Sequence, residues 1–279
     1  MKKRKFNIKK TLSVIIILIS FTTLIICGFK ILGWKKDNNK IEEQINEIKE
    51  ITSVTEVEDN ENTEVIEQEE KAKLPSYYYD FIKMNLISVD FNELKNTNND
   101  TVGWIQVNGS NVNYPFVQTT NNEYYLSHAY DKSGNYAGWI FLDYRNNINT
   151  LDKNTIIYGH GRLDRTMFGS LRDILTNGWL NDTSNFVIKM STEKENTLWQ
   201  VFSVYRIPTT SDYLRVAFSS ESDFTNFTNM LINRSAYNFE TTVSANDKIL
   251  TLSTCHGQVD KVVIHAKLIK KETRKTITN

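Results

Sequence analysis

The sequence predicts a mainly β domain in which eight strands close, or nearly close, into a barrel, with helices at its N-terminus and one or two helices inserted between strands. Three observations support this fold class. From residue 75 onward the composition is globular for about 200 residues, enough to bury one sizeable core. Eight short segments of this region have the composition and patterning of strands. Helix-like segments between them are few, which favours a barrel.

The N-terminal residues predict a membrane anchor. Residues 1–10 carry six Lys or Arg and no acidic residue, and residues 11–33 form a 23-residue run whose only charge is Lys30. About 20 apolar residues in a helix span the core of a bilayer. We expect a single-pass plasma-membrane protein with its basic end in the cytoplasm and everything after Trp34 outside. A cleaved signal peptide is the alternative, but no clear small-x-small cleavage site follows the run.

Residues 34–74 are expected to form an acidic, solvated and partly helical stalk. Residues 37–73 contain no Pro, Gly or aromatic residue, and isoleucines recur there at the spacing of a short helix or weak coiled coil (Ile41, Ile45, Ile48 and Ile51). The chain has no formal net charge, but the six N-terminal positive charges leave 27 basic against 33 acidic residues elsewhere. This acidic remainder offers no electrostatic footprint for nucleic acid.

The elements of the globular part, residues 75–279, follow in order along the chain. Residues 75–94 predict one or two short helices. The eight predicted strands are Gly103–Val107, Val112–Val117, Trp139–Asp143, Thr155–His160, Phe186–Met190, Leu198–Ile207, Lys248–Cys255 and Lys261–Ile269. Two helices are predicted to interrupt them, at Met167–Leu175 and Ser222–Arg234.

Cys255 is the only cysteine outside the apolar N-terminal segment, and it ends a predicted strand. An exported chain normally pairs its cysteines or has none. A lone thiol in such a chain is therefore either an inert core residue or a nucleophile. Strand alternation places Ile249, Thr251, Ser253 and Cys255 on one face.

Four histidines are candidate partners for this thiol. His160 ends an apolar run and lies between two glycines, so it is expected at a strand end where the backbone turns tightly. His256 adjoins Cys255, but adjacent strand residues point to opposite faces. His265 lies inside the last strand, where a packed or surface imidazole is the default, and His128 could lie near a groove.

Lys261 is the expected cationic member of the site. Residues 256–260 form a connection of hairpin length, so Cys255 and Lys261 become neighbours across the turn. An ammonium group there would favour the thiolate and could donate to an oxyanion. A solvated lysine at a turn is the simpler alternative.

Several motifs in a fixed order point to one family. They are Asn-Asp-Thr-Val-Gly-Trp-Ile (99–105), Tyr-Pro-Phe-Val-Gln (114–118), Tyr-Tyr-Leu-Ser-His (124–128), Ile-Phe-Leu-Asp (140–143), Tyr-Gly-His (158–160), Thr-Met-Phe-Gly-Ser-Leu (166–171) and Thr-Leu-Ser-Thr-Cys (251–255). Together they resemble a class B sortase, a membrane-anchored cysteine transpeptidase of Gram-positive bacteria. The resemblance runs from about Tyr77 to Lys270.

The resemblance implies an eight-stranded sortase barrel and a Cys–His–Arg site with Cys255 and His160 in the first two roles. The family's Arg begins the last strand, where this chain has Lys261. Lys keeps the charge but loses the planar fork of Arg. Donors from elsewhere are Arg162, Arg206 or Arg215. We also expect three residues to contact the substrate, namely Ser253, Thr254 and His128.

The implied reaction cleaves a C-terminal sorting signal of a secreted protein after Thr and joins the acyl group to an amine of a peptidoglycan precursor. Family signals resemble Asn-Pro-x-Thr-x or Ser/Pro-Pro-x-Thr-Gly. A pilin polymerase and a weak or non-catalytic sortase-like module stay open as alternatives. A papain-like peptidase is disfavoured because His160 precedes Cys255. No His, Cys or Asp cluster has ligand spacing, so no metal or cofactor is expected.

Overall fold

The computed structural model describes residues 8–68, 74–255 and 260–275, and for Ile8 and Cys255 it describes the backbone alone. Most of the predicted basic tail, His256 and the rest of the predicted hairpin connection up to residue 259 therefore lie outside the described residues. The chain divides into two units, residues 1–43 and 44–279, and each is considered by itself.

The first unit consists of helix α1 (Ile8–Ile51), whose last turns belong to the second unit. Its large apolar side chains between Leu12 and Trp34 are exposed. At 1.5 Å per residue, residues 11–33 extend about 35 Å, slightly more than the hydrocarbon core of a bilayer. This part of α1 is long and apolar enough to cross a membrane. The helix also runs through the predicted isoleucine repeat without a break.

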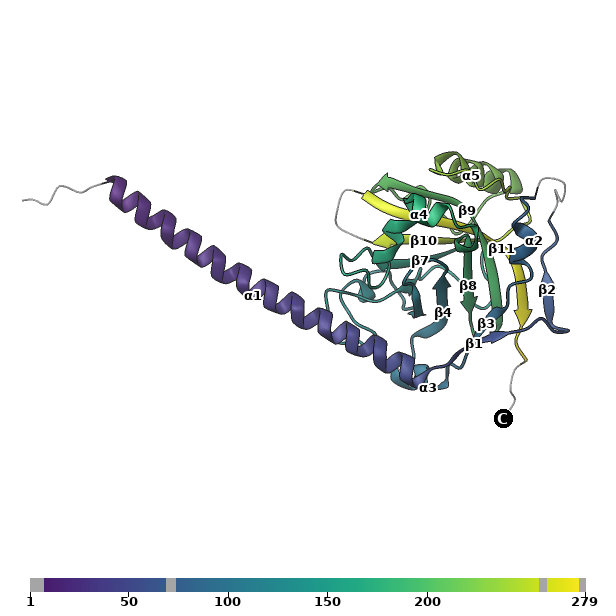
Figure 1. The fold of residues 1–279 in the computed structure, drawn as a ribbon, viewed down its shortest axis with the longest axis horizontal. Helices are drawn as coiled ribbons and strands as arrows, with labels where there is room; N and C mark the ends of the chain where they lie inside the picture. Colours follow the sequence, from purple (N-terminus) through teal and green to yellow (C-terminus); the bar gives the residue numbers. More distant parts are fainter. Residues whose placement is uncertain (1–7, 69–73, 256–259, 276–279) are drawn as a thin grey trace, which may run out of the picture. The chain divides into compact units, whose positions relative to one another are not determined.

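Eight strands of the second unit form a closed barrel (Figure 1). In spatial order they are β10 (Ile249–Cys255), β7 (Asn154–His160), β6 (Phe141–Leu142), β5 (Asn113–Val117), β4 (Thr101–Val107), β8 (Val187–Ser191), β9 (Glu195–Pro208) and β11 (Asp260–Thr273). Pairing between β10 and β11 closes the ring. The pairs β5–β6 and β7–β10 are parallel and the others antiparallel.

The eight predicted strands are confirmed, although β6 covers only two residues of its predicted range. The predicted helix Ser222–Arg234 is confirmed as α5 (Glu221–Arg234), and the predicted helix Met167–Leu175 is the 3-10 helix η3 (Gly169–Leu175). Residues 75–94 contain α2 (Tyr78–Phe81), then strand β3 (Leu86–Val89), before α3 (Asn92–Thr97). Three further short helices are η2 (Tyr124–Leu126), α4 (Asn177–Leu180) and η4 (Thr183–Asn185).

Part of the expected stalk differs from the prediction. It forms β1 (Val54–Val57), which pairs with β3, and β2 (Thr63–Val65), which pairs with β11. The physical reason lies in two buried lysines of β11. Lys270 reaches Asp59 at 2.5 Å, and Lys267 reaches Gln68 at 2.6 Å. A buried ammonium group needs such partners, so this segment lies against the barrel and not in solvent.

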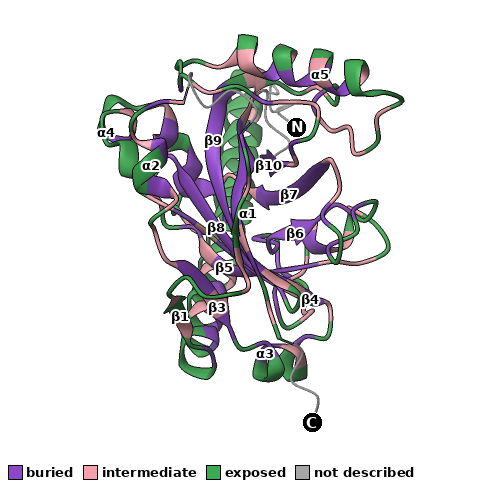
Figure 2. Ribbon diagram, turned by 90° about the vertical axis from the view of Figure 1, so that its right-hand side faces the viewer, coloured by how far each residue is buried: buried purple, intermediate pink, exposed green. Residues whose placement is uncertain are grey.

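Helix α5 packs on the outside of the barrel against β9, near the beginnings of β7 and β10. It begins at Ser220, whose side chain accepts from the Asp223 N–H, and acidic residues in its first turn suit the helix dipole. Its apolar face packs on β9, β10 and β11 in a cluster that includes Phe202, Tyr205, Tyr213, Phe224, Phe227, Leu231, Ile249 and Val263. Figure 2 shows buried strands beneath a helix whose outer surface is exposed.

Candidate active site

Cys255 and His160 are neighbours at the ends of two parallel strands. In the register of β7 and β10 they are direct Cα partners. The pairing holds over the preceding six residues of each strand, so the positions do not depend on a loop. Adjacent strands lie about 4.8 Å apart, so two residues far apart in sequence meet at one edge of the barrel.

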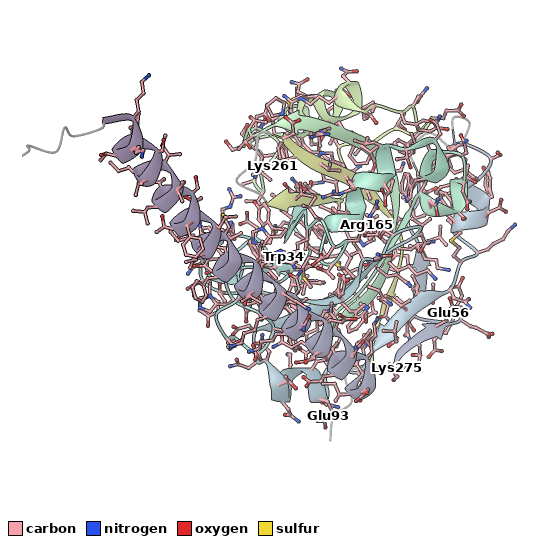
Figure 3. All side chains as sticks on the ribbon, turned by 60° about the vertical axis from the view of Figure 1, so that its left-hand side comes forward. Trp34, Glu56, Glu93, Arg165, Lys261 and Lys275 are labelled. Carbon is pink, nitrogen blue, oxygen red and sulfur yellow. The ribbon has the colours of Figure 1, made fainter. Side chains whose placement is uncertain are left out.

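Lys261 lies at the start of β11, the third strand at this edge (Figure 3). The last described pair between β10 and β11 is Ser253 with Val263. Continuing that register by two residues sets Lys261 opposite Cys255. The Lys261 side chain is half-buried, and none of the described residues forms a hydrogen bond or ion pair with its ammonium group.

The three arginines considered as substitute donors are each paired with a carboxylate. Arg162 binds Asp164 at 2.5 Å. Arg206 binds Asp260 at 3.0 Å and is largely exposed. The third, Arg215, binds Asp223 at 2.6 Å. Each of these three guanidinium groups therefore already has a carboxylate partner within the protein.

The His160 imidazole is half-buried and its Nε2 lies 2.8 Å from the carbonyl oxygen of Leu126. Leu126 ends η2, the segment that also leads to His128. The His128 ring stacks on Tyr124 with centroids 4.0 Å apart, and its Nδ1 lies 2.7 Å from the Tyr124 carbonyl. His128 thus helps to shape the segment that contacts His160.

Ser253 and Thr254, expected to contact substrate, are buried and their hydroxyl groups are engaged within the protein. The Ser253 hydroxyl lies 2.9 Å from the hydroxyl of Tyr213, and the Thr254 hydroxyl accepts from the Val262 N–H at 2.9 Å. These two hydrogen bonds hold the end of β10 to the loop that contains Tyr213 and to β11. It does not bring the two hydroxyls to the surface.

His265 is packed in the core, one of the two outcomes expected for it. Thr251 lies 2.9 Å from its Nδ1 and Tyr205 lies 2.8 Å from its Nε2. Burial, with the nearby positive charge of Arg234, lowers the pKa of His265 to about 3. His265 is therefore neutral at physiological pH and is a structural residue of the strand pair that carries the site.

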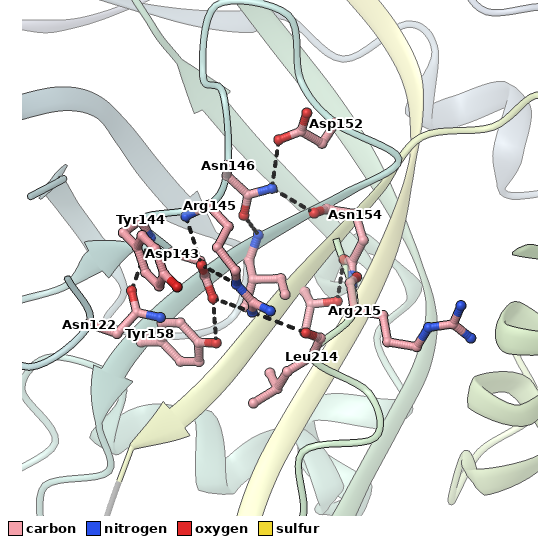
Figure 4. A network of polar contacts seen from close by, with 12 residues as sticks. Asn122, Asp143, Tyr144, Arg145, Asn146, Asp152, Asn154, Tyr158, Leu214 and Arg215 are labelled. Atoms are coloured by element: carbon pink, nitrogen blue, oxygen red, sulfur yellow. Dashed lines mark hydrogen bonds and ion pairs between the residues drawn. The ribbon is translucent and has the colours of Figure 1, made fainter. Parts of the chain in front are cut away.

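A polar network lies where the barrel meets the loop between β9 and α5 (Figure 4). Asp143 is fully buried and binds the Arg145 guanidinium through both carboxylate oxygens, at 2.8 and 2.7 Å. It also accepts from the Tyr158 hydroxyl at 2.9 Å. Burial alone would raise the pKa of Asp143, but the hydrogen bonds from Arg145 and Tyr158 outweigh it and hold the pKa below its usual range.

The same network holds the loop backbone in place. Arg145 donates to the Leu214 carbonyl at 3.0 Å, and the Asn154 side-chain amide donates to the Arg215 carbonyl at 2.8 Å. The hydroxyl of Tyr213, the residue before Leu214, hydrogen-bonds with the Ser253 hydroxyl of β10. Three consecutive loop residues, 213–215, are therefore bound to the barrel. The loop thus forms a rigid border beside the strand that ends in Cys255.

Sequence reasoning missed the groups that support the site. The Leu126 carbonyl has no side-chain signal, and Tyr213 and Arg145 are remote in sequence from both Cys255 and His160. In the sequence, Asp143 stands out only as the last residue of the motif at 140–143. A charged residue at the end of an apolar strand, two positions from an arginine, was the one available sign of this network.

Known proteins share much of the sequence and the fold of this chain. A model of the sortase domain matches residues 105–269. Sortase B of Listeria monocytogenes is 36% identical over 186 residues, which cover 65% of this chain and 75% of that protein. The Staphylococcus aureus sortase B-substrate complex matches with a TM-score of 0.61 and 34% identity, over 64% of this chain and 84% of that chain.

The structure of sortase B from Bacillus anthracis in complex with AAEK1 matches over more of the chain, with a TM-score of 0.65 and 33% identity, covering 86% of this chain and 99% of that chain. The sortase-domain match begins within β4, ends within β11 and includes the paired residues His160 and Cys255. The chain therefore belongs to the sortase family and is a class B, sortase-type transpeptidase.

Proposed function

We propose that this sortase cleaves a C-terminal sorting signal of a secreted protein after Thr and joins the new acyl group to an amine of a peptidoglycan precursor. Cys255 is the nucleophile, His160 the general acid and base, and Lys261 the donor to the oxyanion. The observation that carries this assignment is the direct pairing of Cys255 with His160 in adjacent parallel strands. Residues paired in this way project from the same face of a sheet, as a thiol and imidazole partner must.

In the first half of the reaction, the Cys255 thiolate attacks the Thr carbonyl carbon. The bond between sulfur and carbon forms, and the negative charge moves to the carbonyl oxygen. When the intermediate collapses, the peptide C–N bond breaks and His160 gives its proton to the departing amine. The product is a thioester between the enzyme and the signal-bearing protein.

In the second half, the acceptor amine attacks the thioester carbon and loses its proton to His160. A new amide bond forms, the C–S bond breaks and the thiolate is regenerated. The amine must reach the thioester before water does, so transpeptidation requires that the enzyme hold the acceptor in position.

Lys261 supports the oxyanion role through its position and its lack of an internal partner among the described residues. A donor that meets charge only in the transition state affects kcat more than substrate binding. Because the ammonium group is a point charge without a fork, it can stabilise the oxyanion but cannot also align a carbonyl in the bidentate manner of Arg.

The length and exposed apolar surface of α1 support an anchor in the plasma membrane. The excess of positive charge in residues 1–10 favours a cytoplasmic N-terminus. The catalytic unit then lies outside the cell, where it meets secreted proteins and cell-wall precursors.

Steady-state transpeptidation by the full chain in detergent micelles tests this proposal, with signal peptides and two acceptors, a peptidoglycan stem peptide and a peptide with a pilin-like Lys. Cys255→Ala is expected to abolish product formation. Lys261→Gln is expected to lower kcat by about 10²-fold with little change in KM, whereas the control Arg206→Gln, at a neighbouring cation paired with Asp260, stays near wild type.

Equal activity of Lys261→Gln and Arg206→Gln would remove Lys261 from the mechanism. Preference for the pilin-like Lys over the stem peptide would replace wall anchoring by pilus assembly. Hydrolysis or turnover that survives Cys255→Ala would overturn the nucleophile assignment.

A further inference from the structure

We propose that Leu126 and Gly138 are positioning residues that hold the His160 imidazole with its proton on Nε2, so that Nδ1 is the nitrogen that takes up and releases the proton in catalysis. The inference rests on the proposed function for the role of His160. Its structural part, the tautomer of His160, stands independently and can be measured in the resting protein.

The first observation is the contact of 2.8 Å between His160 Nε2 and the Leu126 carbonyl oxygen. A carbonyl oxygen accepts hydrogen bonds and cannot donate them. Nε2 must therefore carry a hydrogen, in the neutral as well as in the charged imidazole. In the neutral ring the second nitrogen, Nδ1, is then the basic one.

The Leu126 carbonyl is held in place by two neighbouring segments of the chain. The Trp139 N–H donates to the Tyr125 carbonyl at 2.9 Å, and the Asn135 N–H donates to the Ser127 carbonyl at 2.9 Å. These two backbone bonds flank Leu126 on either side. The Tyr125 hydroxyl also binds Asp100 at 2.9 Å. The acceptor for His160 is therefore fixed before substrate arrives.

The second observation is the close packing of the imidazole on Gly138. This glycine has φ of +63°, and a Cβ atom at its position would lie 2.7 Å from His160 Cδ2 and 3.1 Å from Nε2. It would also lie 2.5 Å from the Tyr125 carbonyl oxygen. The bare backbone of Gly138 thus forms one wall of the space in which the imidazole lies, on the side of the ring that carries Cδ2 and Nε2.

The two contacts act together on one ring edge. The hydrogen bond to the Leu126 carbonyl turns Nε2 of His160 toward it. The missing side chain of Gly138 leaves space for the Cδ2–Nε2 edge of the ring, and an added Cβ would occupy that space. A 180° rotation of the ring about its Cβ–Cγ bond would place Cε1 where Nε2 lies and would break the hydrogen bond to Leu126. A general acid displaced by about 1 Å can lose 10²-fold in rate, so the contacts bear on the chemical step.

The test compares Gly138→Ala with a matched control, Gly109→Ala. Gly109 has nearly the same backbone conformation, with φ of +68°, and a Cβ atom there would meet the Asn185 side chain, not a histidine. Both variants impose the cost of a left-handed alanine, but Gly138→Ala alone pushes on His160.

Two readouts are taken on the full chain in detergent micelles. The first is the tautomer of His160, from nitrogen-15 NMR of histidine-labelled protein, with the His160 signals assigned by their loss in His160→Gln. The second is the rate of acylation by a signal peptide in a single turnover, measured together with KM.

We expect Nε2-protonated His160 in the wild type and in Gly109→Ala, and a mixture of tautomers in Gly138→Ala. Acylation by Gly138→Ala is expected to fall by about 10- to 100-fold, with KM changed by less than about twofold because signal binding does not use the imidazole. Gly109→Ala should acylate like the wild type.

An Nδ1-protonated His160 in the wild-type protein would overturn the proposal without any variant, even if Gly138→Ala failed to fold. Equal acylation rates for the two glycine variants would overturn the role of Gly138. If the wild type formed no acyl adduct while His160 was Nε2-protonated, the proposed function would fail and the positioning of the ring would stand.

Discussion

The buried imidazole of His265 predicts a specific loss of stability in mild acid. In the folded protein its pKa is lowered to about 3, chiefly by burial. In the unfolded chain a histidine has a pKa near 6.5. The unfolded state therefore binds a proton that the folded state does not, so this residue's contribution is fully present above pH 6.5 and is lost as the pH falls toward 3.

The size of the effect follows from the two pKa values. Between pH 7 and pH 5 the unfolded imidazole becomes almost fully protonated while the folded one stays neutral. The free energy of unfolding then falls by about 2 kcal/mol on account of His265 alone. This is a considerable part of the 5–15 kcal/mol that typically stabilises a domain.

The assay is urea unfolding of the full chain in detergent at pH 7 and pH 5, followed by tryptophan fluorescence, for the wild type and His265→Gln. The amide of Gln does not titrate but can hydrogen-bond with Tyr205 or Thr251. The difference between the two pH values isolates His265, because the other three histidines are common to both proteins. We expect the wild type to lose about 2 kcal/mol more than His265→Gln. Equal losses in the two proteins would refute a neutral, buried His265.

Three further variants test other parts of the structure. Asp143→Asn removes a buried carboxylate from its guanidinium partner and should lower the free energy of unfolding by about 2–4 kcal/mol, whereas Asp212→Asn, in a half-exposed ion pair, should cost at most about 1 kcal/mol; equal losses in urea unfolding would contradict the role of burial. Lys261→Arg should maintain or raise the acylation rate, and a loss would indicate a groove shaped around Lys. His160→Ala should abolish acylation, and normal turnover would shift the acid role to another residue.

The eight strands were predictable because each has its own local signal of alternating or continuous apolar residues. The position of Cys255 at the end of β10 and of His160 at the end of β7 followed from the same signals. Their direct pairing did not, because the order of strands in the barrel depends on contacts between distant segments. The resemblance to class B sortases implied only that the two residues share a site, and the register of β7 and β10 shows that they are paired.

What the sequence did not predict depends on contacts at long range. Residues 54–65 looked like solvated stalk because they are acidic and lack aromatic residues, yet Lys267 and Lys270 of β11 require polar partners from this part of the chain. Ser253 and Thr254 are predicted to contact substrate, and the structure adds that their hydroxyl groups hydrogen-bond with Tyr213 and with the β11 backbone. No local pattern contains this information.

The central claim is that Cys255 forms a thioester with a sorting signal and passes it to an amine. Intact-mass spectrometry of the full chain, mixed with a panel of signal peptides, tests it most directly. We predict a mass gain equal to the acyl part of one peptide, located on Cys255 by fragmentation and lost when an amine acceptor is added. A folded protein that gains no mass with any peptide, or an adduct that persists in Cys255→Ala, would contradict the claim.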